Sequence, residues 1–154
     1  ACLTMGIAWG YRRDDGEAKS STELIRILVD VVSRGGNLLL NVGPKPDGTV
    51  PEHLVARLRD IGQWMEVNGD SIYGTRKVTD VTATSGKLTG KGDRLYLHLE
   101  GRDADTVTLS GLKRPVKGAT LLATGDALAV DKATITLPET LPDPAVSVVV
   151  IELE

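Results

Sequence analysis

The stretch GGNLLLNVGPKPDGTVPEHLVARLRDIGQWMEVNGDSIYGTR, residues 35–76, decides the fold because it joins an apolar strand, a turn and an amphipathic helix. Its three successive leucines predict a strand over residues 37–42 that is buried on both faces, as in a parallel sheet. From Pro51, apolar residues recur at steps of three and four, which predicts a core-facing helix. Asn68 and Gly69 tolerate positive φ and are expected to end it.

A second amphipathic helix is predicted upstream, over residues 20–34. Ser21 or Thr22 is available as its amino cap, and Gly35 is its carboxyl stop. The turn at Gly35 and Gly36 is too short for an antiparallel rearrangement. Strand or loop, helix, strand and helix therefore follow one another as two successive βα units.

Two βα units cannot form a closed sheet alone. Eight strands close a (β/α)₈ barrel, so a quarter of one exposes two hydrogen-bonding edges and its helix faces. Ala1 also begins without a capping or initiating feature. We therefore expect an internal starting point, and an upstream polypeptide that completes the sheet.

From residue 77 onward the sequence predicts only strands, and their spacing is typical of an antiparallel sandwich or jelly roll. The clearest strand, Arg94 to Glu100, alternates leucines with Tyr96, His98 and Glu100, which predicts one buried and one solvent-facing side. Further strands are expected at residues 106–110, 119–123, 134–137 and 147–153. The fold class is thus α/β over residues 1–76 and all-β over 77–154.

Composition argues against several classes of function. The net charge of −3, with evenly spread Lys and Arg, gives no electrostatic footprint for nucleic acid. No apolar run reaches the roughly 18 residues of a membrane span. Cys2 is the single cysteine, which excludes an internal disulfide, and His53 and His98 lie far apart, so no metal or cofactor is expected.

Residues 35–76 resemble, at high specificity, the barrel end of the α-L-fucosidases of glycoside hydrolase family 29. In that family a strand of the form GNLLLN-x-GP is followed by DGT, a helix and VNG-x-x-IYGT. The segment CLTMGIAWGYRRDD, residues 2–15, is similar to the family's seventh-strand region. The resemblance implies strand 7, helix 7, strand 8 and helix 8 of the barrel over residues 1–76, followed by an accessory β-sandwich over 77–154.

The function implied by this resemblance is that of a retaining exo-α-L-fucosidase, which removes terminal α-L-fucosyl residues from glycans. Trp9 matches the aromatic residue that lines the family's sugar pocket and packs against the apolar edge of fucose, including its C5 methyl. Asn41, at the carboxyl end of its strand, is a second candidate for contact with the substrate or a pocket neighbour. The alternatives are a structural Trp9 between strand and loop, and an Asn41 that orients the loop backbone.

A retaining glycosidase needs two carboxyl groups roughly 5–5.5 Å apart. The resemblance puts the nucleophilic aspartate on a middle barrel strand and the acid/base glutamate just ahead of Cys2, both upstream of Ala1. No catalytic residue is therefore expected in this chain. Its own acids on the catalytic face are loop residues, most often turn formers or helix caps, namely Asp14, Asp15, Glu17 and Asp47.

The remaining aromatic, cysteine and histidine residues are read as structural. Cys2 is expected to be a small buried hydrophobe and Trp64 to pack in the core, while Tyr73 wedges the two domains together. Tyr11 is a candidate for the pocket rim that the sequence alone does not place there, and His53 is expected to face solvent in the first turn of its helix.

A binding module is the alternative to an enzyme. The sandwich would then be a non-catalytic carbohydrate-binding or structural fragment. Sugar-binding modules present exposed aromatic rings, whereas Tyr96 is the only aromatic residue after position 77. The sequence therefore favours the enzyme fragment.

Overall fold

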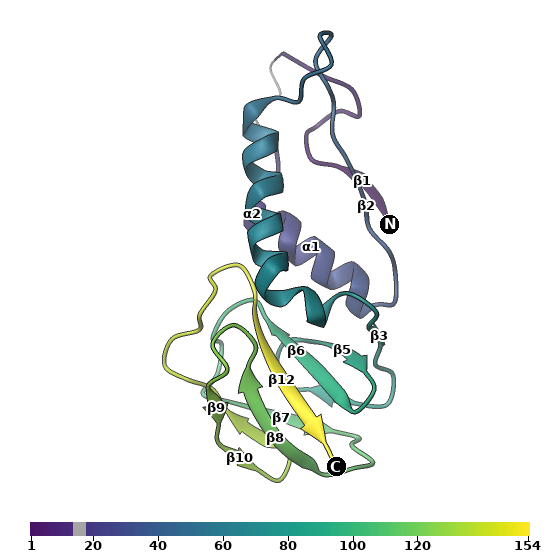
Figure 1. The fold of residues 1–154 in the computed structure, drawn as a ribbon. Coiled ribbons are helices and arrows are strands. Elements are labelled where there is room, and N and C mark those ends of the chain that lie inside the picture. Colours follow the sequence, from purple (N-terminus) through teal and green to yellow (C-terminus); the bar gives the residue numbers. More distant parts are fainter. Residues whose placement is uncertain (14–17) are drawn as a thin grey trace.

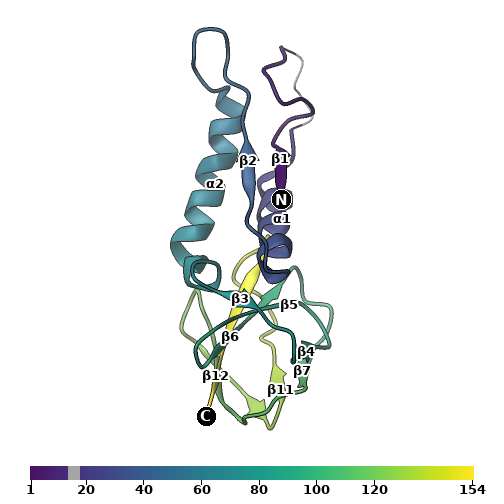
Figure 2. The same cartoon turned by 90° about the vertical axis from the view of Figure 1, so that its right-hand side faces the viewer.

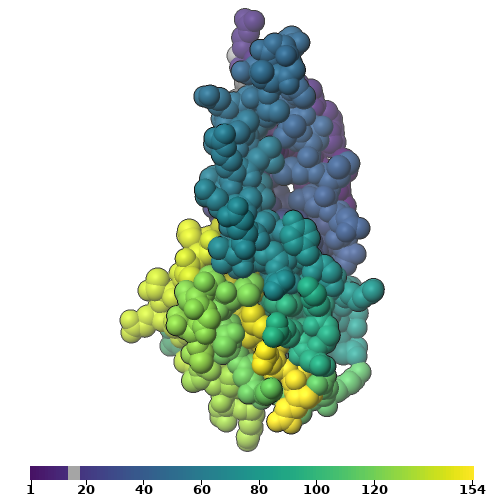
Figure 3. Space-filling model, viewed as in Figure 1, coloured from purple at the N-terminus to yellow at the C-terminus, as the bar shows by residue number. Residues whose placement is uncertain are grey.

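The computed structural model of the protein describes residues 1–13 and 18–154 and shows an elongated molecule with two regions stacked end to end (Figure 1). The space-filling view shows the two regions as one continuous body (Figure 3). The first region contains β1 (Cys2–Thr4), α1 (Ser21–Ser33), β2 (Leu39–Asn41) and α2 (Glu52–Asn68). A short 3-10 helix, η1 (Gly69–Ser71), leads into the second region, which is built of strands.

Strands β1 and β2 are parallel neighbours with α1 as their connection, as the sequence predicts. Only one face of this pair is covered within the described residues, where Leu40 packs with Leu24 of α1 and Leu54 of α2. The predicted burial on both faces is therefore wrong for Leu39, which is 66% exposed. Cys2 is the register partner of Leu39 and shares its face, so it too is exposed and not buried as predicted.

Helix α1 begins one residue earlier than its predicted caps allow. Ser20 is the amino cap, and a reciprocal capping box joins it to Glu23: the Glu23 N–H donates to Ser20 Oγ at 3.1 Å, and the Ser20 N–H donates to Glu23 Oε2 at 3.3 Å. At its other end the chain turns at Gly35, with φ of +83°, as predicted for the carboxyl stop.

Helix α2 follows Pro51, which occupies the amino-cap position without a side-chain hydrogen bond. Helix α2 ends at Asn68, as predicted, but without the positive φ that these residues tolerate, since Gly69 has φ of −57° and begins η1. The positive φ comes later, at Gly74, with a value of +72°. The helical path therefore runs one further turn before the chain enters the sandwich.

The second region is a pair of antiparallel sheets, which agrees with the predicted sandwich. The six-stranded sheet contains, in spatial order, β3 (Arg76–Lys77), β5 (Lys87–Lys91), β6 (Arg94–Leu99), β12 (Ser147–Leu153), β8 (Val116–Leu121) and β9 (Ala127–Leu128). The four-stranded sheet contains β10 (Val130–Asp131), β11 (Thr134–Thr136), β7 (Thr106–Ser110) and β4 (Thr82–Ala83).

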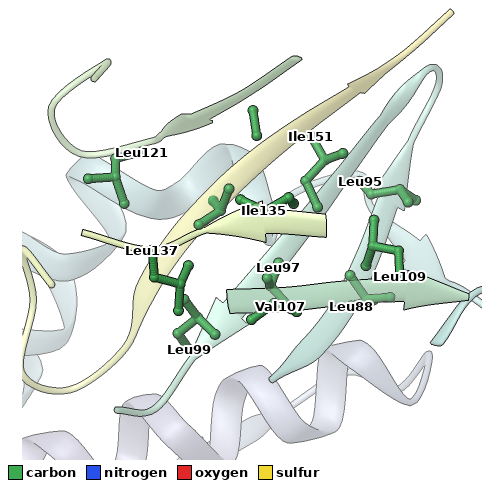
Figure 4. Close-up of a cluster of buried hydrophobic side chains, with 12 residues drawn as sticks. Leu88, Leu95, Leu97, Leu99, Val107, Leu109, Leu121, Ile135, Leu137 and Ile151 are labelled. Atoms are coloured by element: carbon green, nitrogen blue, oxygen red, sulfur yellow. The ribbon is translucent and has the colours of Figure 1, made fainter. Parts of the chain in front are cut away.

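The sandwich core lies between these sheets, where side chains from facing strands point toward one another (Figure 4). Leu97 of β6 and Ile151 of β12 meet Val107 of β7 and Ile135 of β11, and all four are fully buried. Burial of a Val, Leu or Ile side chain contributes about 1.5–3 kcal/mol each, so this layer is a major source of stability.

The second face of β6 is also buried, contrary to the prediction that it faces solvent. Tyr96 and His98 are 2% and 0% exposed, and they lie in or beside a second cluster with Val29 of α1, Trp64 of α2 and Val148 of β12. The two helices cover this face of the six-stranded sheet, which is why the expected polar side is dry. Trp64 is a core residue, as predicted.

Polar tethers fix the helices to the sandwich. Trp64 Nε1 donates to the Val146 carbonyl at 2.9 Å, and Arg26 of α1 donates to the carbonyls of Ala145 at 3.1 Å and Glu100 at 2.7 Å. Tyr73 does not wedge the regions together as predicted, because its side chain is 67% exposed. The neighbouring Ile72 takes the buried place instead.

Candidate functional site

The loops that follow β1 and β2 lie side by side at the end of the molecule far from the sandwich (Figure 2). The carboxyl ends of parallel strands are where barrel enzymes and open α/β proteins bind their substrates. Trp9 stands in the first loop and Asn41 at the end of β2. The structure thus brings together the two residues that the sequence singles out.

Asn41 holds the loop that carries Trp9. Its Nδ2 donates to the Trp9 carbonyl at 2.8 Å and to Thr4 Oγ1 at 3.1 Å, so both amide hydrogens are used. Thr4 Oγ1 in turn lies 3.2 Å from the Ala8 carbonyl, to which it donates. The two Asn41 contacts join residues 32 and 37 positions apart in the sequence, and together with the Thr4 contact they fix the loop backbone on the strand ends.

The two loops also touch backbone to backbone. A Cβ placed on Gly43 would lie 2.6 Å from the Gly10 carbonyl carbon and 2.7 Å from the Tyr11 nitrogen. Only glycine permits this approach. The strand predicted over residues 37–42 ends just before Gly43, but the sequence does not reveal this packing; the available signal is the glycine that directly follows the strand.

Trp9 projects away from this held backbone, with its side chain 58% exposed. Tyr11, the candidate for the pocket rim, is 38% exposed two residues further on. A large apolar ring that is exposed on a fixed backbone offers a flat surface to the apolar edge of a ligand. The geometry therefore fits Trp9 as part of a binding wall.

A hollow of about 590 Å³ lies beside Tyr11, where the two loops meet the first turn of α2. Its lining carries three cationic side chains and one carboxylate, and comprises Tyr11, Arg12, Arg13, Lys45, Pro51, Glu52 and His53. His53 is exposed there, as predicted.

The loop acids have no arrangement that favours acid–base chemistry within the described residues. Asp47 Oδ1 accepts from the Thr49 N–H at 2.9 Å and from Thr49 Oγ1 at 2.7 Å, and these hydrogen bonds hold the pKa of Asp47 below its ordinary value. An ionised carboxylate fixed in a turn fits a turn former better than a proton donor. Asp14, Asp15 and Glu17 lie outside the described residues.

His98 is remote from this site, buried between the sandwich and the helices. Burial, and then the charge of Lys87, lower the pKa of His98 to about 4, which keeps the imidazole neutral.

Across residues 1–13 and 18–154, no three His, Cys, Asp or Glu side chains gather closely enough to hold a metal ion. Neither helix in that part of the chain has the length and apolar character needed to cross a membrane.

Known proteins resemble this chain over its whole length. A sequence profile of the α-L-fucosidase family matches residues 1–70. The α-L-fucosidase of Branchiostoma floridae is 32% identical over 153 residues, which cover 86% of this chain and 34% of that protein. Among solved structures, α-L-fucosidase isoenzyme 1 from Paenibacillus thiaminolyticus has a TM-score of 0.92 and 35% identity, over 99% of this chain and 39% of its own.

A family 29 α-L-fucosidase from Bacteroides thetaiotaomicron, solved as a trapped covalent intermediate, has a TM-score of 0.87 and 27% identity over 99% of this chain and 37% of its own. The chain therefore spans well under half the length of these relatives. The profile covers both strand ends and Trp9, and the structural matches extend through the sandwich. The chain belongs to the α-L-fucosidase family, glycoside hydrolase family 29, and is consistent with the carboxy-terminal portion of such a protein.

Proposed function

We propose that this chain is part of a retaining exo-α-L-fucosidase that hydrolyses terminal α-L-fucosyl residues from glycans, and that it supplies one wall of the sugar pocket. The observation that carries the proposal is Trp9, exposed on a held backbone at the carboxyl ends of β1 and β2. Fucose is a 6-deoxy sugar whose C5 methyl and adjacent C–H groups form an apolar edge. A flat indole packs against that edge without leaving a polar group unpaired.

The first region is proposed to be the end of the barrel, with β1 and β2 as strands 7 and 8 and a domain boundary between residues 76 and 77. The parallel register and the order β1, α1, β2, α2 support this assignment. In a barrel, the strand face opposite the helices is packed in the interior. The exposed Leu39 and Cys2 lie on that face, where the remaining six strands would cover them.

The catalytic carboxylates are proposed to lie on an upstream polypeptide. A retaining mechanism passes through a covalent glycosyl-enzyme intermediate, formed by one carboxylate while a second carboxyl group acts as acid and then base. The covalent intermediate trapped in the Bacteroides relative supports this route. Asp47, the loop acid that the structure describes, accepts two hydrogen bonds from Thr49, which does not favour a catalytic role for it. In this proposal the chain contributes to binding the fucosylated substrate, and the partner polypeptide supplies the chemistry.

The sandwich is proposed to be a scaffold for the last helices. It lies at the end of the molecule opposite the Trp9 loop, and it packs on α1 and α2 through a shared apolar cluster. Tyr96, its one aromatic residue, belongs to that cluster and is not available for stacking on a sugar. These observations favour a scaffold over a carbohydrate-binding module.

Kinetics on 4-nitrophenyl α-L-fucoside test the proposal in the protein that combines this chain with the rest of the barrel. Trp9→Ala is expected to lower kcat/KM by roughly 10- to 100-fold, since it removes an apolar wall of the pocket. Tyr73→Ala is the matched control, because Tyr73 is an exposed aromatic residue at the junction with the sandwich. Unchanged kinetics in Trp9→Ala would refute the pocket wall, and an inactive wild type would refute the activity itself.

A further inference from the structure

We infer that Asn41 and Thr4 are positioning residues that set the sugar specificity of the pocket by holding the backbone on which Trp9 stands. The inference rests on the proposed function, because it concerns the same pocket. Neither residue needs to touch the sugar for this role. Both act through Trp9.

The first support is the pair of consecutive carbonyls that these side chains hold. Asn41 Nδ2 lies 2.8 Å from the Trp9 oxygen, and Thr4 Oγ1 lies 3.2 Å from the Ala8 oxygen and 3.4 Å from the Asn41 oxygen. The Asn41 amide also donates to Thr4 Oγ1 at 3.1 Å, so the two side chains form one connected unit. The backbone at Trp9 is therefore fixed from the two strand ends at once.

The base of the same loop is closed as well. The Met5 N–H donates to the Asn41 carbonyl at 3.0 Å and the Lys19 N–H to the Met5 carbonyl at 2.9 Å, while Lys19 Nζ donates to the Thr4 carbonyl at 3.1 Å. Both stems of the loop are thus anchored beside the strand ends. Movement of Trp9 requires these contacts, or those of Asn41 and Thr4, to break.

Gly43 supplies the third constraint. Its α-carbon lies so close to the Gly10 and Tyr11 backbone that no side chain fits between them. The loop is therefore supported directly after Trp9, while the Trp9 side chain remains exposed. Such an arrangement fixes a ligand-binding side chain before the ligand arrives.

The chemistry of Asn41 separates positioning from direct binding. Both of its N–H groups are used within the protein, so it has no donor left for a sugar hydroxyl. Its contribution as a donor is therefore made through the loop. Loss of this donor is expected to change how well the pocket distinguishes sugars, since that depends on where Trp9 stands.

Discrimination at C5 is the property most sensitive to the position of Trp9. L-Galactose differs from L-fucose only by a hydroxyl on the C6 carbon, and an apolar wall rejects it by failing to satisfy that hydroxyl and by limiting the space around it. A displaced wall admits water and the larger group. A general loss of folding would lower the rates on both sugars equally and leave their ratio unchanged.

The experiment compares kcat/KM for 4-nitrophenyl α-L-fucoside and 4-nitrophenyl α-L-galactoside, again in the protein that includes the rest of the barrel. Asn41→Asp replaces the donating amide by acceptors of nearly the same shape, and the fucoside to galactoside ratio is expected to fall about tenfold. Thr4→Val is expected to lower it less, in the same direction. Asn37→Asp is the matched control, since Asn37 is an exposed asparagine just before the amino end of β2, and it should leave the ratio unchanged.

A double variant decides whether Asn41 acts through Trp9. In the Trp9→Ala background, Asn41→Asp should cause no further fall in the ratio, because the positioned side chain is already gone. A further fall of similar size would overturn the inference, and so would an Asn41→Asp enzyme that loses rate equally on both substrates. If Asn41→Asp does not fold, Gly43→Ala displaces the same backbone without adding charge, and an unchanged ratio there would overturn it too.

The two proposals fail in different ways. A wild-type protein that hydrolyses neither glycoside contradicts the proposed function. A wild-type protein that hydrolyses the fucoside, with a ratio insensitive to Asn41, Thr4 and Gly43, leaves the function standing and removes only the positioning role.

Discussion

The His98 side chain is completely buried, and its hydrogen bond to Thr89 fixes which ring nitrogen carries the hydrogen. The Thr89 hydroxyl donates its hydrogen to the Ser71 carbonyl at 2.8 Å, so His98 Nε2 must donate to Thr89 Oγ1 at 3.0 Å. Nδ1 has no hydrogen-bond partner among the described residues. Because burial and then the charge of Lys87 lower the pKa of His98 to about 4, a proton on this ring destabilises the fold.

The free energy of unfolding is therefore expected to depend on pH between about 6.5 and 4. The unfolded histidine has the ordinary pKa of 6.5, so across this window the unfolded state binds the proton and the folded state does not. Stability is full above pH 6.5 and falls as the pH drops toward 4, by up to about 3 kcal/mol. Urea unfolding at a series of pH values measures the slope.

Two substitutions test whether His98 causes this pH dependence of the free energy of unfolding. His98→Gln should flatten it, whereas His53→Gln, at the exposed histidine, should leave it unchanged. Asp80 and Asp93, whose pKa values are lowered by hydrogen bonds from Lys113 and Arg114, add their own loss of stability only toward the acid end of this window, because the unfolded carboxyl titrates near 3.8. Wild type and His98→Gln share that contribution, so it cancels when the two are compared. The same slope in wild type and His98→Gln would contradict the assignment.

Individual site residues differ in how far the sequence reveals them. Trp9 and Asn41 are candidates because Trp9 stands in a loop after a strand and Asn41 at a strand end, each inside a recognisable motif. Thr4 and Gly43 are missed, because their roles come from contacts with residues 37 and 33 positions away, which no local pattern records. A threonine on a strand and a glycine before a proline look ordinary until the fold brings them to the same loop.

Helix α1 depends on its amino cap for part of its stability. Ser20→Ala removes the acceptor for the Glu23 N–H and is expected to lower the free energy of unfolding by about 1 kcal/mol, measured by urea unfolding. Ser20→Asp keeps an acceptor and should stay within a few tenths of a kcal/mol of wild type. Equal losses in both variants would show that the cap is not the cause.

Helices and strands were predictable to different depths. The periodicity of apolar residues places α1 and α2 within about two residues, because one face of each helix must pack on the core. The span of β6 was equally clear, but its second buried face was not. Alternation records the chemistry of each side chain and cannot show that two helices cover the polar side.

Tyr and His are amphipathic, and both occupy a dry face when a partner satisfies their polar atoms. Thr89, on the neighbouring strand β5, is that partner for His98 Nε2. The pairing of β5 with β6 depends on the tertiary structure. The burial of the second face of β6 could therefore not be predicted from the sequence of that strand alone.

At the scale of the whole molecule, the exposed face of the β1 and β2 pair is the surface on which we expect another polypeptide to pack. We expect the purified chain to associate with the polypeptide that carries the first six strands, so that its native mass exceeds the 16.4 kDa of the chain alone. Leu39→Asp should leave the fold of this chain intact, since Leu39 is exposed, but should abolish the association. A wild-type chain that stays monomeric in the presence of that polypeptide would contradict the barrel assignment.

The measurement that tests the central claim most directly follows the sugar released from 4-nitrophenyl α-L-fucoside by proton NMR. The protein that joins this chain to the rest of the barrel should release fucose first as the α-anomer, before mutarotation, because a retaining mechanism preserves the anomeric configuration. Trp9→Ala should slow this release without changing the anomer. Release of the β-anomer first, or no release of fucose at all, would contradict the claim that this chain forms part of a retaining α-L-fucosidase.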